Sequence, residues 1–594
     1  MRCNRQLTLS HKSFIFDVAK VNAGPKRAFS FYKELSGSYD NVGATATDFN
    51  NFGRNMKARV GKHDADIIID QFKMKQQKSN NSFFFEHKVD ADGHLTGLFW
   101  ADAIGQRNYK IFGDVLSFDP TFRTNRYNMV FVPFTGVDNH WNNVTFDAAL
   151  LEKEDYTNFQ WVIQAFEKAM GGKRPKCAIT DQCPAISKAL GLTWETTPHR
   201  LCMSHIMNKL SYKIGPSLAS DKKFMTSLKS IVYADHLSEN EFEEGWTKVM
   251  EEYKLQDNTW LQEMYAIRTD WIPVYFNDIP MVGLLRTTSR SESSNSFFQY
   301  FHRRGSTLVE FYSRFESALE KQRYNNAQSN KDSQLIPKPH TPLAIEKDAA
   351  NVYTRNLFNF VSGEIKNALH FTKIDDMVNF NGIKSLMVND KLLQDHIFEV
   401  SITLSNNDVH CSCKFYDRVG YLCRHAFAAL IQCDAVEIPR QLVMSRWIKD
   451  VESVHEVLSS DEVLQHCAKI DRIKVKVNEL NFEFQSCISY VGVDEEKIDK
   501  MCGHVKLMKE DVQDLDNGPS KKLSENVIDF LIGTTPRSEV VIHNPNINRN
   551  KGCGSRLKSG KEAAMNGSSE KRRKCSNCGK TEGHNARSCP LNKN

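Results

Sequence analysis

The sequence has no apolar run near the length of about 20 residues that a membrane-spanning helix needs. Its first residues, MRCNRQLTLSHKSF, lack the hydrophobic core of a secretory signal. Neither sign of charge dominates, because 78 Lys and Arg stand against 72 Asp and Glu, and a net charge of +6 does not by itself indicate nucleic-acid binding. These absences predict an intracellular protein with no membrane partner. Its 15 cysteines then favour metal binding over disulfides.

One short segment carries a complete set of metal ligands. Cys411-Ser-Cys413 is followed, after nine residues, by Cys423-Arg-His425. Three thiolates and one imidazole fill the tetrahedral shell of Zn²⁺ and leave no position for water. We therefore expect a structural zinc site at Cys411, Cys413, Cys423 and His425, in preference to cysteines that only pack in a core.

The end of the chain is basic, with twelve Lys or Arg against three acids from Arg549 onward. One group of residues there is the cationic run Lys571, Arg572, Arg573 and Lys574. It indicates a nuclear import signal or a phosphate contact, with a solvated linker as the alternative. The other is the set of ligands Cys575, Cys578, His584 and Cys589. This spacing resembles the zinc knuckle, which binds single-stranded nucleic acid, although five residues precede the histidine where four are common.

The middle of the chain predicts a sheet. Short apolar runs at 109–119, 127–138 and 142–151 have strand length and are bounded by turn residues, which is typical of a meander. A helical period follows over 158–170, and then a further strand at 176–181. The predicted order is strand, strand, strand, helix, strand.

Carboxylates follow two of these strands. Asp119 ends the first and Asp181 ends the last. In a ribonuclease-H-like sheet, metal-binding aspartates occupy these two places, and a helix supplies a third carboxylate, a role that Glu292 fits. Three such acids can hold two Mg²⁺ ions for phosphodiester transfer. The alternative is ordinary acids at strand ends and helix caps.

A Cys-x-x-His pair, Cys202 and His205, lies after the second aspartate in a segment with helical character. The two side chains could supply two ligands to a metal, or they could be a buried thiol and a core histidine. Packing is the favoured interpretation.

Several segments resemble those of a plant family, the FAR-RED IMPAIRED RESPONSE related-sequence proteins derived from Mutator-like transposases. They are LFWADAIGQRNYKIFGDVLSFDPTFRTNRYNMVFVPFTGVDNH, AITDQCPAISKAL, HRLCMSHI, WLQEMYAIRTDWIPVYF, RTTSRSESSNSFF and CSCKFYDRVGYLCRHAFAAL. The resemblance covers about residues 1–450. It identifies the Cys411–His425 cluster as a SWIM zinc finger, places the catalytic-core acids of the family on Asp119, Asp181 and Glu292, and places its Cys/His pair on Cys202 and His205.

The resemblance implies a domesticated transposase that is not an enzyme and acts in the nucleus as a regulator of transcription in light signalling. The implied partners are DNA and related proteins, as a homodimer or heterodimer, with no small-molecule substrate. The implied cofactor is structural zinc, with magnesium at the acids only if they are active. Two alternatives stay open: an active magnesium-dependent Asp-Asp-Glu transposase, and a heterodimer partner that does not bind DNA. The second arises because the chain opens after the zinc domain with which family members usually begin. There are two further departures from the family pattern. The segment Asp119-Pro120-Thr121 lacks the second threonine that is usual there, and Ser204 stands where relatives carry tryptophan. Neither change removes an expected ligand.

The predicted fold is α+β: a ribonuclease-H-like transposase core with a helical insertion, then a small SWIM zinc finger and a disordered basic tail ending in a zinc knuckle. The expected domains are a linker region at 1–95, the core at 96–300 with its helical insertion at about 183–289, a helical region at 301–390, the SWIM finger at 391–435, a helical region at 436–512, a disordered linker at 513–574 and the knuckle at 575–594.

Overall fold

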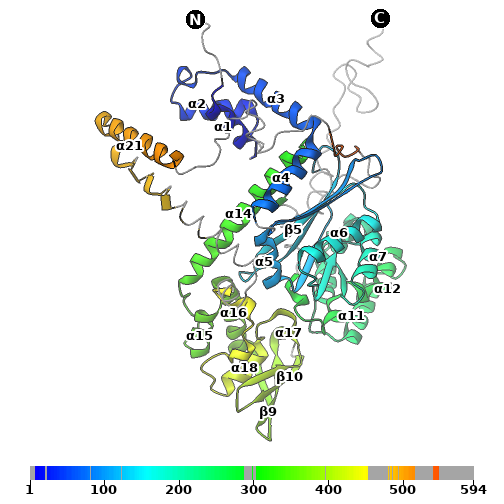
Figure 1. The fold of residues 1–594 in the computed structure, drawn as a ribbon. Coiled ribbons are helices and arrows are strands. Elements are labelled where there is room, and N and C mark those ends of the chain that lie inside the picture. The colour runs from blue at the N-terminus through cyan, green and yellow to red at the C-terminus, as the bar shows by residue number, and fades with distance from the viewer. Residues whose placement is uncertain are drawn as a thin grey trace, which may run out of the picture. The chain divides into compact units, whose positions relative to one another are not determined.

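The computed structural model describes residues 7–20, 23–79, 82–121, 124–285, 297–298, 303–394, 396–451, 494–514 and 540–547, with parts of 472–492 (Figure 1). Two compact units contain these residues. The sheet unit lies within residues 1–201 and 276–550, and the helical unit covers 202–275. None of the helices in the described ranges combines the length and the hydropathy that crossing a bilayer requires.

A seven-stranded sheet forms the centre of the sheet unit, as far as the described residues go. Its strands are β1 (Phe84–Val89), β2 (Leu95–Ala101), β3 (Val115–Phe118), β4 (Val130–Val137), β5 (Asn143–Leu151), β6 (Cys177–Thr180) and β7 (His199–Leu201). Their order is β1-β2-β5-β4-β3-β6-β7. Neighbours from β1 to β3 are antiparallel, whereas β3–β6 and β6–β7 are parallel. The predicted order of three strands, a helix and a strand is confirmed, with α6 (Tyr156–Ala169) as the crossover helix that a parallel pair needs.

The first predicted strand was too long. Residues 109–112 belong to helix α5 (Ala103–Phe112), and only Val115–Phe118 form the strand. Asp102 caps the start of the helix by accepting a hydrogen bond from the Gly105 N–H (2.7 Å). Tyr109 and Phe112, three residues apart, are both buried, so the apolar run there follows the helical period.

Both faces of the sheet are covered, which explains why every residue of β4 is buried. Along β4, Phe131 belongs to one core, and its neighbours Val130 and Val132 belong to the other. The second core contains residues of α5, α6 and α7 (Pro184–Thr193). Alternation across a sheet that is buried on both sides therefore produces a continuous apolar run.

The first core joins distant parts of the chain. It is built by α1 (Leu9–Lys20), α2 (Pro25–Leu35), α3 (Ala46–Lys62), α4 (Asp64–Lys78) and α14 (Leu308–Gln334). Helices α4 and α14 lie side by side (Figure 1). Residues 36–53 are rich in Gly and Asn, a composition typical of a loop, but α3 begins at Ala46. Its capping box between Thr45 and Asp48, and its apolar residues Phe49, Met56 and Val60 at helical spacing, outweigh the low helix propensity of the asparagines.

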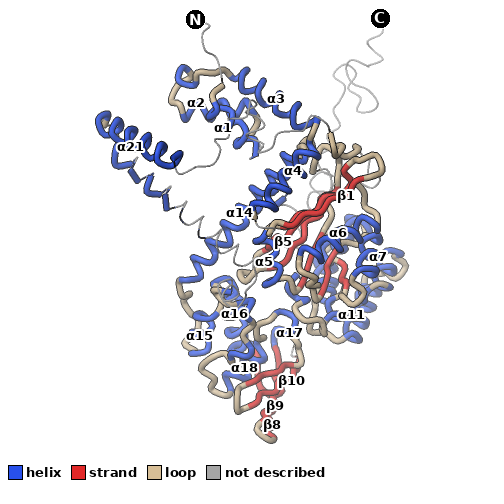
Figure 2. The backbone as a smooth tube through the Cα atoms, viewed as in Figure 1, coloured by secondary structure: helices blue, strands red, loops and turns tan. Residues whose placement is uncertain are grey.

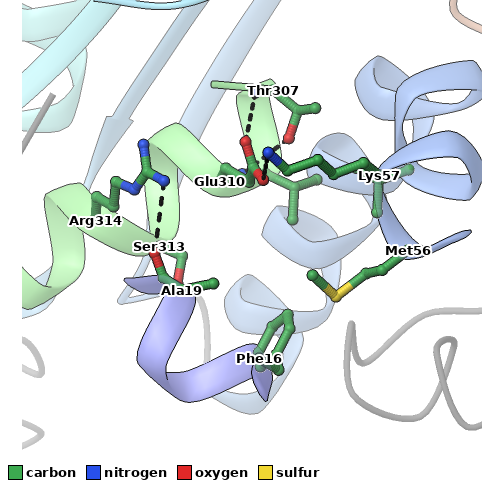
Figure 3. A pocket seen from close by; sticks show the side chains of 10 residues that line it. Phe16, Ala19, Met56, Lys57, Thr307, Glu310, Ser313 and Arg314 are labelled. Atoms are coloured by element: carbon green, nitrogen blue, oxygen red, sulfur yellow. Dashed lines mark hydrogen bonds and ion pairs between the residues drawn. The ribbon is translucent and has the colours of Figure 1, made fainter. Parts of the chain in front are cut away.

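A small cavity of about 30 Å³ lies where α1, α3 and α14 meet (Figure 3). The start of α14 is fixed there by a capping box between Thr307 and Glu310. Lys57 reaches Glu310 from α3 at 4.0 Å, and the Arg314 guanidinium donates to the Ala19 carbonyl at 3.5 Å (Figure 3). The volume equals about one water molecule, so the cavity is a packing gap and not a ligand site.

Asp64 caps α14 from another helix. Its fully buried carboxyl accepts hydrogen bonds from the Leu308 N–H (2.6 Å), the Val309 N–H (3.1 Å) and the Tyr127 hydroxyl (2.9 Å). Burial raises the pKa of Asp64 to about 6, although these hydrogen bonds and Arg126 act to lower it. The carboxylate thus holds α4, α14 and the β3–β4 connection together.

Because the pKa of Asp64 is raised on folding, the folded chain binds more protons than the unfolded chain between pH 3.8 and about 6. The contribution of Asp64 to the free energy of unfolding should therefore fall by about 3 kcal/mol as the pH rises through this window. Denaturant unfolding at a series of pH values, for the wild type and Asp64→Asn, measures it. In the variant, the free energy of unfolding should lose this part of its dependence on pH. An equal pH dependence in the two proteins would contradict the raised pKa of Asp64.

The disordered linker expected at 513–574 contains an ordered segment. Residues 540–547 dock on the sheet unit, where Asp66 accepts hydrogen bonds from the N–H groups of Val541 (3.1 Å) and Ile542 (2.8 Å). Asn544 accepts from the Ala65 N–H (3.0 Å) and donates to the Gly61 carbonyl (3.0 Å), so that it bridges the end of α3 and the start of α4. His543 pairs with the β1–β2 turn. These contacts order the segment although the composition of the surrounding sequence is polar.

A second, four-stranded sheet has the order β11-β10-β9-β8. Its strands are β8 (Thr372–Phe380), β9 (Ile383–Asp390), β10 (His396–Thr403) and β11 (Asp408–Cys411). The alternation of the sequence at 396–411 is typical of a hairpin, and β10 and β11 form one; α18 (Arg424–Gln432) follows as the closing helix. Figure 2 shows α18 beside β8, β9 and β10.

The region expected to be helical at 301–390 ends in the β8–β9 hairpin instead. Its turn, Asn381-Gly382, has positive φ at both residues, the conformation that a two-residue hairpin turn requires. Within that region, two helices, α15 (Ala344–Val352) and α16 (Arg355–Phe371), precede the hairpin. Short 3₁₀ turns at Arg440–Leu442 and Ser445–Trp447 follow the finger, and α21 spans Glu495–Asp514.

The helical unit begins at Cys202, later than the expected start of the helical insertion at about residue 183, because α7 and β7 belong to the sheet unit. Its helices are α8 (Met203–Lys213), α9 (Pro216–Ala219), α10 (Lys222–Val232), α11 (Glu239–Glu252) and α12 (Thr259–Ala266). Trp271 is buried within it and donates to the Met264 carbonyl (2.9 Å).

Candidate metal centre and acidic site

The four predicted zinc ligands lie together in the structure. One donor atom from each of Cys411, Cys413, Cys423 and His425 lies within 4.8 Å of all the others. Cys411 ends β11, Cys413 follows it, and Cys423 is the N-cap of α18, which carries His425 as its second residue. A hairpin and a helix N-terminus thus present two ligands each.

A buried carboxylate orients the histidine. Asp390, at the end of β9, lies 2.9 Å from His425 Nε2 and 3.1 Å from the Arg424 guanidinium. His425 Nδ1 lies 3.6 Å from the Cys411 sulfur. With the Nε2 proton donated to Asp390, the Nδ1 lone pair points toward the thiolates, which is the arrangement of a metal-bound histidine and its supporting carboxylate. Phe398 stacks on the imidazole, with ring centroids 4.1 Å apart.

The electrostatics of the cluster favour a cation. Burial acts to lower the pKa of His425, but hydrogen bonds to Asp390, Cys411 and Cys413 outweigh it and raise the pKa to about 11. Hydrogen bonds with Cys411 and Cys423 lower the pKa of Cys413 well below its usual value. Surroundings that hold a proton on His425 would hold Zn²⁺ in its place, with release of that proton. Three sulfurs and one nitrogen fit structural zinc.

Two predicted acids meet at the edge formed by parallel strands. In the β3–β6 pair, Ser117 lies opposite Ile179, and the same register continued two residues on places Asp119 opposite Asp181. Both side chains are half-buried. Asp181 also accepts a hydrogen bond from the Cys183 N–H (3.2 Å), which directs the chain into α7. Parallel strands in register bring the two carboxylates together.

A third acid joins them from a different loop. Glu154 lies between β5 and α6. Its pKa is raised to about 7, first by burial and then by the negative charges of Asp181 and Asp119. Only the structure identifies Glu154 as a member of this site. The sequence has Glu152, Glu154 and Asp155 within four positions, and nothing in their spacing distinguishes one from the others. Asp390 is the other residue that sequence reasoning missed, because it precedes His425 by 35 positions.

The remaining predicted residues divide into two groups. Outside the described residues lie Glu292, Lys571, Arg572, Arg573, Lys574, Cys575, Cys578, His584 and Cys589. Cys202 and His205 lie in the helical unit, where Cys202 is the buried N-cap of α8 and His205 follows within its first turn. Among the described side chains, this pair belongs to no group of three or more potential metal ligands.

Comparison with known proteins places both sites within families. Residues 115–209, which include Asp119, Glu154 and Asp181, match the MULE transposase domain, and residues 398–434 match the SWIM zinc finger. The SWIM match and the geometry of the four ligands together imply structural zinc.

Relatives from Arabidopsis thaliana match most of the chain. Protein FAR1-RELATED SEQUENCE 5 is 27% identical over 83% of this chain and 62% of its own length, and FAR1-RELATED SEQUENCE 4 is 30% identical over 70% and 55%. Protein FAR-RED IMPAIRED RESPONSE 1 is 27% identical over 82% and 59%. The chain therefore spans less than two thirds of the length of these relatives. It is a homologue of the FAR-RED IMPAIRED RESPONSE proteins, with segments that match a MULE transposase domain and a SWIM zinc finger.

Proposed function

We propose that this chain is a nuclear, DNA-binding regulator of transcription that no longer acts as a transposase. One relative is named for an impaired response to far-red light, and we extend to this chain a role in light-responsive development. The observation that carries the transposase origin in this proposal is the acidic edge of the sheet: Asp119, Asp181 and Glu154 lie together inside the segment that matches a transposase domain.

The order of the strands supports a ribonuclease-H-like core. Strands β5, β4 and β3 form an antiparallel meander, and β6 and β7 extend it in parallel beside β3. This is the order in which such a core places one acid after its first strand and another after its fourth. Asp119 follows β3 and Asp181 follows β6, the first and fourth strands of this core.

The acidic edge fits a divalent cation by its chemistry. Asp119, Asp181 and Glu154 would be the ligands, with Glu292 as the fourth acid that the family pattern suggests, and a bound Mg²⁺ would supply activation of a water or hydroxyl for phosphodiester transfer. In this chain we propose that the acids preserve the shape of a DNA-binding core. Active strand cleavage is the second candidate function, and the register of Asp119 and Asp181 is the observation in its favour.

An exposed strand supports self-association or pairing with a related protein. In the four-stranded sheet, β8 has a neighbour on one side only among the residues that the structure describes. Its side chains Met377, Val378 and Phe380 are 47%, 55% and 72% exposed. An edge strand with apolar side chains presents both unpaired backbone groups and apolar surface to a partner.

One experiment separates the candidates. Labelled duplex and single-stranded DNA are incubated with the purified chain and Mg²⁺, and binding and cleavage are read from the same samples. We expect binding that weakens linearly in log–log form with salt, and no cleavage. Deletion of residues 548–594 removes twelve cations while keeping the docked segment, and should weaken binding by about 100-fold or more at moderate salt and reduce the salt slope.

Matched variants identify the cause. Changing Lys571, Arg572, Arg573 and Lys574 to Gln should reproduce part of the lost slope if charge is responsible. Cleavage by the intact chain that Asp181→Asn abolishes would replace our proposal with an active transposase. Absence of salt-dependent binding by the intact chain would leave only the partner protein that does not bind DNA.

A further inference from the structure

A large cavity lies in a part of the sheet unit that neither the acidic edge nor the zinc cluster uses. Its volume is about 1020 Å³, the upper end of the range for small-molecule sites. The end of β2, helix α5, the first half of β5 and helix α14 line it. Its walls contain aromatic side chains, among them Trp100, Tyr312 and Phe315, and also several charged groups.

Asp147 differs from the other acids of this lining in being buried without a hydrogen-bond partner. Its side chain is only 2% exposed, and neither of its carboxyl oxygens has a hydrogen-bond partner. The neighbouring Thr145 hydroxyl, which also lines the cavity, lacks a partner as well. Asp147 lies on β5 opposite Phe134, next to the register shift between Phe134 and Thr135. A buried carboxyl without partners is costly, so native proteins rarely keep one without a use.

Three of the other four acids of the cavity are already paired, and the fourth, Glu320, is exposed to solvent. Asp102 receives both hydrogen bonds from the Arg323 guanidinium (2.7 and 2.8 Å). Asp138 accepts from the N–H groups of His140 and Asn142 and from the Asn326 amide. Glu316 pairs with Lys75. Asp147 is therefore the acid of the lining that is both buried and unsatisfied.

The charge of the lining favours a cation. Its acids are Asp102, Asp138, Asp147, Glu316 and Glu320, against Lys75, Arg107 and Arg323. Burial raises the pKa of Asp147 well above its usual range, and no neighbouring cation offsets this. A positively charged group that reached Asp147 would stabilise the ionised carboxylate, which releases its proton to water, and would gain a charge-assisted hydrogen bond in a poorly solvated place, where such bonds are strongest.

We propose that this cavity binds an elongated ligand that ends in a guanidinium or ammonium group, with Asp147 as its ion-pair partner. Two free oxygens match the two parallel N–H groups of a guanidinium, and the Thr145 hydroxyl can accept a further hydrogen bond. The aromatic side chains can pack against the alkyl part of the ligand and attract its cation through their ring faces. An arginine or lysine side chain of a partner protein and a free polyamine share this chemistry.

Isothermal titration calorimetry with three probes tests the proposal: arginine amide, spermidine and an acetylated hexapeptide with one central arginine. We expect Asp147→Asn to weaken binding of the best probe by about 10- to 100-fold, because a hydrogen bond to a charged group is lost. The control Asp332→Asn removes an acid from α14 that is not part of the lining and should leave affinity unchanged.

A second variant guards against misfolding. Ala327→Trp places a bulky side chain at the cavity from an exposed position of α14, so it should block binding without disturbing the core. Thermal unfolding of both variants shows whether they remain folded. Preference for the peptide would identify a partner side chain as the ligand, and preference for spermidine a free polyamine. Equal affinity in wild type and Asp147→Asn, or no binding of any probe at millimolar concentration, would overturn the proposal.

Discussion

Replacing Cys423 with Ser should remove about one zinc ion per chain and unfold the finger around it. Structural zinc sites contribute apparent free energies of about 10–16 kcal/mol, so loss of one of four ligands costs several kcal/mol locally. Serine keeps the N-cap function that Cys423 performs for α18, where its sulfur accepts from the Ala426 N–H (3.4 Å). The loss would therefore report the metal and not the cap.

Metal content is measured by atomic emission on the purified chain, and local unfolding by hydrogen exchange over residues 396–432. Cys433→Ser is the matched control, because Cys433 lies one residue beyond α18 and outside the group of four ligands. It should change neither measurement. Unchanged zinc in Cys423→Ser would refute the assignment of the ligands, and equal loss in both variants would point to general damage.

Replacing Arg446 with Met should lower the free energy of unfolding by about 3 kcal/mol, because it breaks a buried ion pair. Arg446 is 4% exposed, contacts Asp114 at the start of β3 and donates to the Val137 carbonyl (2.6 Å). Its guanidinium also lies 4.7 Å from the Trp447 ring centroid. The segment after the finger is thereby joined to the central sheet.

Burial acts to raise the pKa of Asp114, but Arg446 and then Lys176 outweigh it and keep the pKa below its usual value. In Arg446→Met the carboxylate keeps Lys176 (3.1 Å) as its ion-pair partner but loses its buried one, so the loss should be smaller at low pH, where Asp114 is protonated in both proteins. Arg440→Met is the control: Arg440 is half exposed and pairs with Asp348 (2.6 Å), and its loss should cost under about 1 kcal/mol. Similar losses in both variants would contradict the argument.

The sequence predicted those parts of the sites that depend on local spacing. Cys411, Cys413, Cys423 and His425 lie within fifteen positions, and the chemistry of zinc specifies what such a set can do. Asp119 and Asp181 were found because each ends a short apolar run, and parallel strands carry their ends to the same edge. Both inferences needed only one or two neighbouring elements.

The rest depended on contacts between distant segments. Asp390 supports His425 through strand pairing that no local pattern records, and Glu154 reaches Asp119 because β5 lies beside β4 in the sheet. Strand β8 was missed because its residues are largely exposed on both faces, so no alternation marks it as a strand. Tertiary packing also decided α3, where buried aromatic side chains outweighed local propensity.

The docked segment at 540–547 has a consequence for the order in which the chain can fold. Asn544 contacts Ala65 across 479 positions, and Asp66 receives its two backbone donors from Val541 and Ile542. During synthesis the α3–α4 corner therefore emerges from the ribosome long before its partners do. Domains tend to fold as they emerge, but the Asp66 carboxylate at this corner cannot bind its two backbone donors until nearly all of the chain has been made. The N-terminal helices are thus among the first residues translated and the last to reach their final contacts.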